Sequence, residues 1–503
     1  MLKRRIFILL ICLMIKTLSA NETIPTDHWV YESIRQFKIA GYMESLENGN
    51  FSYNRGNIAV AIKNVKRESL ESNTLKIEYD RLYKEFQYEI SCVRKENRVV
   101  PNFRISSEFY NQYSTDDDYS IKSRLAGYVS FNDYFSMKYS AYLDNTLLDD
   151  PYYSGYDWRS LTGVQDQIYM SFHKDNMEMK FGRDYVKWGY GRGGNLMVSD
   201  NSRPFDMISL SLTSKYLSFQ TFLTQLDQMY NAERYLTAIR FETKIKNKLF
   251  IGFGQCALYG GENRPVDFTI SNPLAFYSFT QDNDGKSMNM MLYMDFAYNF
   301  LNSHRFYGEL LVDDFQIDKE VTSDLEPNEI GFILGLESVE IIGGVGGYLE
   351  FTQVRNRTYN VPEQRPFEKF LHKNQYIGHQ LGTDFQSIHC ELDRWITSNI
   401  KAYLGWSFVR QGEGTIRGEF TTPYIEEDVT METGYSESIP YGIVETTNRF
   451  YLKMLYQSSS LFRINCLIGY QSIDNYLNVD GSEDSSLWGQ VNLDVFFYKG
   501  IDL

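Results

Sequence analysis

Long hydrophobic runs are what this 503-residue sequence most clearly lacks. Beyond residue 20, no stretch approaches the ~18 consecutive apolar residues that identify a membrane-spanning helix. The mean hydropathy is also negative, at −0.39. These properties exclude helical membrane spans. They leave open a membrane β-barrel, because only every second residue of a barrel strand faces lipid and the average hydropathy stays low.

Cysteine, histidine and a surplus of basic charge are scarce as well. The 5 cysteines lie far apart and the 6 histidines have no ligand spacing, so we expect no metal site, no cofactor and no disulfide framework. The net charge of −15 argues against nucleic acid as a partner. Neither Gly-x-Ser-x-Gly nor His-Glu-x-x-His occurs, so we predict that the protein is not an enzyme. A hydrolase acting on glycan stays an alternative, because 65 acidic residues contain many accidental pairs.

The N-terminus predicts export. Lys3, Arg4 and Arg5 precede the apolar run Ile6 to Ile15, and the small residues Ser19 and Ala20 follow. This order is typical of a cleavable secretory signal over residues 1–20. The apolar run is about half the length of a transmembrane helix, so a retained membrane anchor is the weaker alternative.

Residues 21–95 have the pattern of a small helical module. Ile34, Phe37 and Ile39 lie near one helical face that ends at Gly41, and Leu75 to Ile90 repeats apolar residues at helical spacing. The stretch from Asp27 to Ile62 resembles a degenerate S-layer homology repeat. That resemblance implies a periplasmic module that contacts peptidoglycan or another cell-wall polymer. Of the family's Thr-Arg-Ala-Glu pattern only Arg55 remains, so packing beneath a second domain is the alternative.

From Phe103 onward the sequence repeats with a period of two. One face of Tyr134 to Leu143 carries apolar residues, and the other carries Ser136, Lys138 and Ser140. With 39 Tyr and 34 Phe, this suits aromatic lipid-facing walls around a polar interior. We therefore predict a mainly β fold over residues 100–503, a transmembrane antiparallel barrel of about 18 strands at roughly 22 residues per strand and connection. A large one-sided sandwich is the alternative.

One polar segment, Phe181 to Asp206, concentrates the groups that bind sugars. Aromatic faces can stack on sugar rings, Arg can pair with uronic-acid carboxylates, and Asp and Asn can bond hydroxyls. The expected glycan-binding residues are Arg183, Trp188, Tyr190, Arg192, Asp200, Asn201 and Arg203. Alternatively, the same charges form a network that folds the segment inward and plugs the barrel.

The same segment, together with Ile270 to Tyr277 and Tyr376 to Asp384, resembles the Wzi-type capsule assembly family. The resemblance implies an outer-membrane barrel surrounded by lipid that binds and anchors capsular or other exported polysaccharide. A porin-like channel for solutes or saccharides is the alternative. The largest polar inserts are expected to be extracellular loops: Asp144 to Gln165, Gly260 to Ser271, Thr352 to Lys373 and Gln411 to Thr446.

Overall fold

The computed structural model describes residues 22–502 with several gaps. The gaps are 47–48, 94–103, 117, 131–133, 146, 148–152, 154, 156–161, 175, 317–319, 427–428 and 458–461. The secretory signal expected over residues 1–20 lies outside the described residues. None of the described helices is both long enough and apolar enough to cross a membrane.

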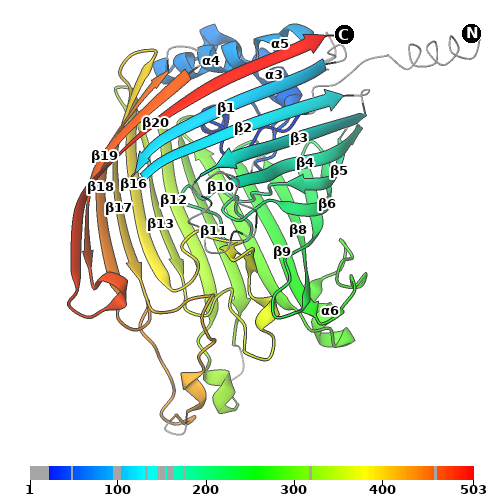
Figure 1. The fold of residues 1–503 in the computed structure, drawn as a ribbon, viewed down its shortest axis with the longest axis vertical. Coiled ribbons are helices and arrows are strands. Elements are labelled where there is room, and N and C mark those ends of the chain that lie inside the picture. Colours follow the sequence, from blue (N-terminus) through cyan, green and yellow to red (C-terminus); the bar gives the residue numbers. More distant parts are fainter. Residues whose placement is uncertain are drawn as a thin grey trace, which may run out of the picture.

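Eighteen strands form one sheet in which every strand pairs antiparallel with its neighbours along the chain (Figure 1). They are β1 (Arg104–Asp116), β2 (Asp118–Ser130), β3 (Phe135–Asp144), β4 (Thr162–Lys174), β5 (Met177–Asp184), β6 (Phe205–Thr213), β7 (Leu217–Gln225), β8 (Glu233–Ile245), β9 (Leu249–Gly261), β10 (Asn289–Phe300), β11 (His304–Asp314), β12 (Glu329–Ile342), β13 (Val345–Val354), β16 (Phe385–Trp395), β17 (Ile400–Gln411), β18 (Glu445–Gln457), β19 (Phe462–Asp474) and β20 (Glu483–Asp502). The first and last strands also pair, with Phe109 opposite Phe497, which closes the sheet. The predicted barrel of about 18 strands is confirmed.

The two ends of the barrel differ in their connections (Figure 1). Short connections such as 214–216 and 246–248 lie at the end covered by the helices, which we call the turn end. Long connections lie at the opposite end, the loop end, and one of them carries helix α6 (Tyr277–Asp284). Three of the four expected loops correspond to the long connections 262–288, 355–384 and 412–444. The fourth is shorter than expected, because β4 already begins at Thr162.

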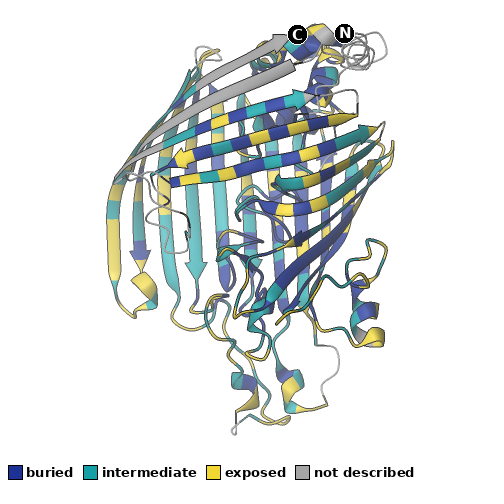
Figure 2. Ribbon diagram, turned by 45° about the vertical axis from the view of Figure 1, so that its right-hand side comes forward, coloured by how far each residue is buried: buried dark blue, intermediate teal, exposed yellow. Residues whose placement is uncertain are grey.

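Alternation along the strands separates an apolar outside from a polar inside (Figure 2). In β3 the exposed residues include Met137 and Tyr139, whereas Ser136, Lys138 and Ser140 are buried. The predicted period of two therefore reports the two faces of the wall correctly. Of the later cysteines, Cys256 is buried and Cys466 is exposed.

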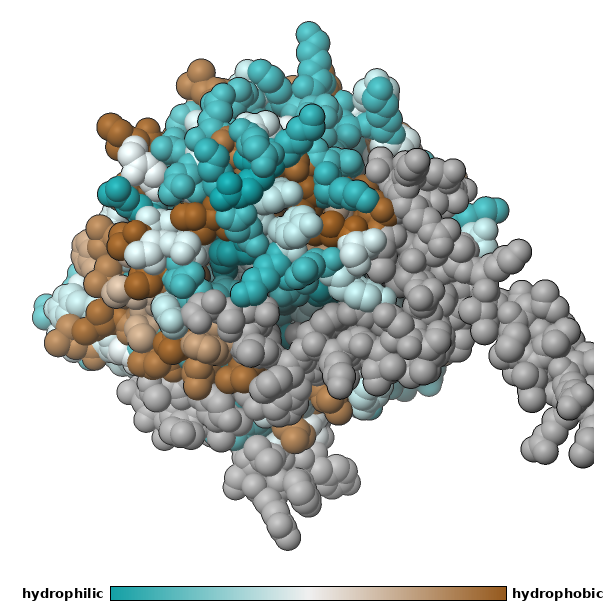
Figure 3. Space-filling view, turned by 90° about the horizontal axis from the view of Figure 1, so that it is seen from above, coloured by the Kyte–Doolittle hydropathy of each residue, from teal (hydrophilic) through white to brown (hydrophobic). Residues whose placement is uncertain are grey.

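The helical module packs against the turn end. It comprises α2 (Val30–Ile39), α3 (Arg55–Lys63), α4 (Asn73–Glu85) and α5 (Gln87–Cys92), with the short 3-10 turn η1 (Arg67–Ser69). Its apolar core includes Val339 of β12. Polar contacts also join it to the wall, since Arg35 pairs with Glu337 at 2.6 Å and Trp395 Nε1 donates to Glu78 at 3.0 Å. Hydrophilic side chains cover much of this end (Figure 3).

Arg55, the residue retained from the S-layer pattern, is used inside the module. Its guanidinium pairs with Glu89 at 2.7 Å and with Glu85 at 3.1 Å, and the side chain is buried. The helix that it begins is capped by Asn54, whose side chain accepts the amide of Asn57 at 2.8 Å. Arg55 therefore stabilises the helix packing and presents no open guanidinium to a polymer.

Candidate functional site

Residues 185–204, which we call the plug segment, fold into the barrel between β5 and β6. These two strands, with β7, are the shortest of the closed sheet. The plug segment's apolar side chains join inward-facing wall residues such as Phe222 and Ile333 in the largest hydrophobic cluster of the described residues. The plug segment contributes six buried residues to this cluster: Val186, Trp188, Tyr190, Leu196, Met197 and Val198. The predicted alternative of an inward plug is therefore what the structure shows for this part.

Two buried wall carboxylates hold the backbone of the plug segment. Glu309 of β11 accepts the amides of Tyr190 and Gly191 at 2.7 Å, the Leu196 amide at 2.9 Å and Asn195 Nδ2 at 2.8 Å. Glu350 of β13 accepts the amides of Arg192 and Gly193 at 2.7 and 2.8 Å. Such bonds satisfy backbone groups that lie away from water and have no strand partner.

Glycine is required where this backbone approaches Glu309. Gly189 has a φ of 121°, and an added Cβ would lie 2.3 Å from Glu309 Oε1. A side chain at Gly189 would therefore displace the carboxylate that anchors the segment. The glycine-rich sequence serves this close approach.

The plug segment also contacts the helical module. Trp188 forms a bridge with Asn50, and the Gly189 amide donates to Gly49 O at 2.9 Å. Arg35 donates to Tyr190 O at 2.7 Å. Arg192 pairs with Glu32 of α2. The wall, the plug segment and the module therefore form one continuous packed unit.

The seven predicted binding residues do not share one surface. Arg183 lies on the outer wall and pairs with Asp206, with Nε at 2.8 Å from Oδ1. Trp188 and Tyr190 are only 3% and 2% exposed, so they cannot stack on a sugar in this structure. Arg192 pairs with the module, and Asp200 pairs with Lys187 at 3.0 Å.

The remaining two, Asn201 and Arg203, lie with residues from distant loops in what we call the loop-end cluster. Asn201 Nδ2 donates to Tyr376 O at 2.9 Å, and Arg203 donates to Tyr142 Oη at 3.3 Å. Arg417 lies over the Tyr376 ring, 4.3 Å from its centroid, and also donates to Tyr376 Oη at 2.8 Å. The cluster consists of Asn201, Arg203, Lys373, Tyr376 and Arg417. Lys373 and Arg417 could not be predicted from the sequence, because loop packing alone brings them here.

The loop-end cluster contains three cationic side chains, those of Arg203, Lys373 and Arg417. Lys373 lies in the turn between β14 (Leu371–His372) and β15 (Gln375–Tyr376), and its side chain is exposed. Partial burial, then the positive charge of Arg183, lower the pKa of its ammonium group; Arg203 acts in the same direction, whereas the carboxylates of Asp206 and Asp227 oppose the shift. Lys373 and Arg417 are exposed, whereas Asn201, Arg203 and Tyr376 are half-buried. Accessible cations beside amide and phenol groups suit a carboxylated sugar.

The long loop 412–444 is fastened beside this cluster by Asp384. Its carboxylate accepts the amides of Gly414 and Tyr441, both at 2.8 Å. Burial raises the pKa of Asp384 to about 6, although the two amides act in the opposite direction. A carboxyl with a raised pKa in the folded state stabilises the fold at low pH, and this contribution is lost as the pH rises through about 6.

We therefore expect Asp384→Asn to remove a pH dependence from the attachment of loop 412–444. At pH 4.5 the wild-type loop should resist proteolysis better than the variant, because the amide nitrogen of Asn cannot accept the Gly414 amide. This advantage should shrink several-fold by pH 7.5. Comparing the cleavage rates of wild type and variant at the same pH cancels the pH dependence of the protease itself. Asp480→Asn, in an exposed loop, is the control. A constant ratio of the two rates would contradict the assignment.

Within the described ranges, no group of three or more His, Cys, Asp or Glu residues could hold a metal ion.

The sequence profile of the family described as capsule assembly protein Wzi matches residues 102–486. A search of curated proteins found no match. A solved Escherichia coli structure, described as Wzi, an outer-membrane protein involved in group 1 capsule assembly that is a carbohydrate-binding β-barrel, aligns with a TM-score of 0.62. It is 15% identical, and the alignment covers 96% of this chain and 100% of that one.

Two Pseudomonas aeruginosa proteins align less closely. OccD3 has a TM-score of 0.45 and 10% identity, with 82% of this chain and 98% of that chain covered. OprD has a TM-score of 0.44 and 9% identity, with 79% and 95% covered.

Proposed function

The chain belongs to the capsule assembly protein Wzi family, and from that premise we propose that it is a non-catalytic outer-membrane protein that binds and anchors surface polysaccharide. The loop-end cluster is the observation that carries the proposal. It presents Lys373 and Arg417 on the surface, with Arg203 and the Tyr376 and Asn201 polar groups beside them. The solved Escherichia coli relative is described as carbohydrate-binding, which agrees with this assignment.

The polymer expected at the loop-end cluster is an acidic capsular or exported polysaccharide. Arg203, Lys373 and Arg417 would pair with carboxylates, and the Asn201 and Tyr376 groups would bond hydroxyls. Each site would bind a few sugar units weakly. A long chain held by many copies on one cell would nevertheless be retained, because each further contact is intramolecular.

In this proposal the loop end faces the exterior, lipid surrounds the apolar wall, and the helical module lies in the periplasm. A contact between the module and peptidoglycan stays a prediction. It would need exposed residues other than Arg55, which is buried against Glu85 and Glu89.

The inward plug segment favours binding over the porin-like alternative. A conducting barrel needs a continuous aqueous path, whereas here the plug segment, the wall and the module are joined by buried contacts.

The experiment that tests the proposal compares cell-attached with released polysaccharide in a deletion strain that expresses variants of the protein. Arg203→Ala with Arg417→Ala should release roughly tenfold more polysaccharide into the medium, because avidity amplifies each weakened contact. Lys215→Ala with Lys246→Ala is the matched control, since it removes two positive charges at the turn end. Normal attachment in the first variant, at normal membrane levels, would exclude the loop-end cluster.

A further inference from the structure

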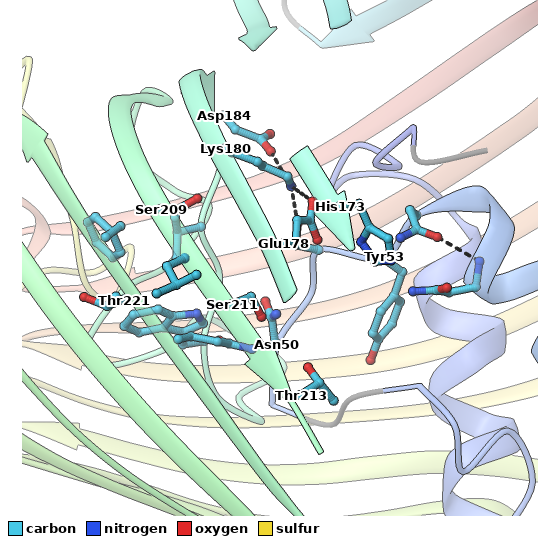
Figure 4. Close-up of a pocket in the computed structure, with 18 of the residues that line it drawn as sticks. Asn50, Tyr53, His173, Glu178, Lys180, Asp184, Ser209, Ser211, Thr213 and Thr221 are labelled. Carbon is cyan, nitrogen blue, oxygen red and sulfur yellow. Dashed lines mark hydrogen bonds and ion pairs between the residues drawn. The ribbon is translucent and has the colours of Figure 1, made fainter. Parts of the chain in front are cut away.

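A cavity lies towards the turn end of the barrel, between the helical module and the inner wall of β4 to β7 (Figure 4). Its volume is about 280 Å³. This lies at the small end of the range for ligand sites, so it suits one sugar ring and is too small for a polymer segment. No residue of the loop-end cluster lines it.

Hydroxyl and amide groups line much of this cavity. On β6, Ser209 and Ser211 face inward, whereas Ile208 and Leu212 on the same strand are exposed on the outer wall. The module contributes Asn50 and Asn57 from the opposite side. Short polar side chains on both walls suit a ligand that carries many hydroxyls.

Charge at the cavity selects against acidic ligands. Lys180 lies 3.0 Å from Asp184 and 3.4 Å from Glu178, as the dashed lines in Figure 4 show, and it also donates to Ser52 Oγ at 3.0 Å. One ammonium therefore faces two carboxylates. The resulting surplus of negative charge would repel a uronate but not a neutral sugar.

Aromatic side chains also line the cavity. In addition, the cavity can be reached from outside the barrel. Trp188 and Phe222 contribute to the lining, with their ring centroids 5.4 Å apart; both rings are almost fully buried, so they shape the cavity and do not stack on a ligand. A second hollow of about 310 Å³ at the turn end shares Ser45, Asn176 and Thr213 with the cavity. The two hollows therefore adjoin, and the route opens between the module and the strand ends.

We propose that this cavity is a separate binding site for a neutral sugar ring that enters from the turn end. Ser209, Ser211 and Asn50 bond its hydroxyls, and the Glu178 and Asp184 carboxylates beside Lys180 supply acceptors. The site differs from the loop-end cluster in position, in size and in the sign of its charge. It does not rest on the proposed polysaccharide anchoring.

The test uses the purified full-length protein in detergent and saturation-transfer NMR of D-glucose, N-acetyl-D-glucosamine and D-glucuronate. At least one neutral sugar should bind with a Kd on the order of 1–10 mM, and glucuronate at least about tenfold more weakly. Ser209→Phe, which fills the cavity, should weaken the binding of the neutral sugar about tenfold or more. Ile208→Phe is the matched control, because it adds the same side chain one residue away on the outer wall.

Ser211→Ala guards against misfolding of the larger variant, since it removes the hydroxyl with little change in size, and it should weaken binding severalfold. Arg203→Ala with Arg417→Ala should leave the binding of the neutral sugar unchanged, which separates this site from the loop-end cluster. Three results would overturn the proposal: no transfer to either neutral sugar, equal binding of glucuronate, or wild-type binding by both Ser209→Phe and Ser211→Ala.

Discussion

Glu309→Ala is expected to turn a closed barrel into an ion-conducting one. The substitution leaves three backbone amides and the Asn195 amide group without their acceptor inside the wall. Each buried donor left unsatisfied costs about 1–3 kcal/mol, so the plug segment should lose at least about 3 kcal/mol of its attachment. An 18-stranded barrel without its plug is wide enough for water and ions. Single-channel recording in planar bilayers measures the change directly.

Leu310→Ala is the control for this experiment. Leu310 is the next residue on β11 and is 42% exposed on the outer wall, so its truncation leaves the plug segment untouched. Wild type and Leu310→Ala should show no steady conductance, whereas Glu309→Ala should show frequent openings and a lower melting temperature. A silent Glu309→Ala barrel of normal stability would mean that Glu350 and the module hold the segment without Glu309.

Arg357→Ala is expected to free the loop 412–444 from its neighbour. Arg357 is 2% exposed, forms two bonds of 2.9 Å with Glu437 and donates to Thr421 O at 2.8 Å. Removing one partner of a buried pair costs about 3–5 kcal/mol, because the other charge stays buried. Proteolysis inside the loop should accelerate roughly 100-fold as the loop opens locally.

Mass spectrometry of the fragments locates the cleavage, and Arg355→Ala is the matched control. Arg355 lies two residues away and is half-buried, and its side chain makes a 3.5 Å contact with Asn328 O. Because Arg417 belongs to the same loop, Arg357→Ala should also release polysaccharide. Faster cleavage with normal retention would show that Arg417 does not need a fixed loop.

The wall could be predicted from the sequence because its signal is local. Each strand needs only a period of two, as Ser136, Lys138 and Ser140 show on β3, and the strand number follows from length. The pairing of β1 with β20 is not local, and it follows only because a closed sheet leaves no unpaired edge in lipid.

The candidate site could be predicted only in part, because burial and binding use the same residue types. Trp188 and Arg192 would serve a sugar site equally well, but Glu309 and Glu350 fold their segment inward from more than 110 residues away. Many strands of the wall carry a carboxylate at an inward-facing position, and nothing in the sequence indicates which of these carboxylates contacts the plug segment. Arg417 and Tyr376 come together for the same non-local reason.

The position of the plug segment in the chain also favours one order of assembly. The module precedes all eighteen strands, residues 185–204 precede thirteen of them, and the seam between β1 and β20 forms between the first strand and the last. Both ends of the plug segment join strands at the loop end, so after the seam has closed its bulky side chains can enter the barrel only through that mouth. Placing them while the sheet is still open avoids this passage, and they can then serve as the core around which the later strands wrap. Biogenesis of this barrel is in that sense a wrapping process, and the last hydrogen bonds to form at the seam would complete the enclosure.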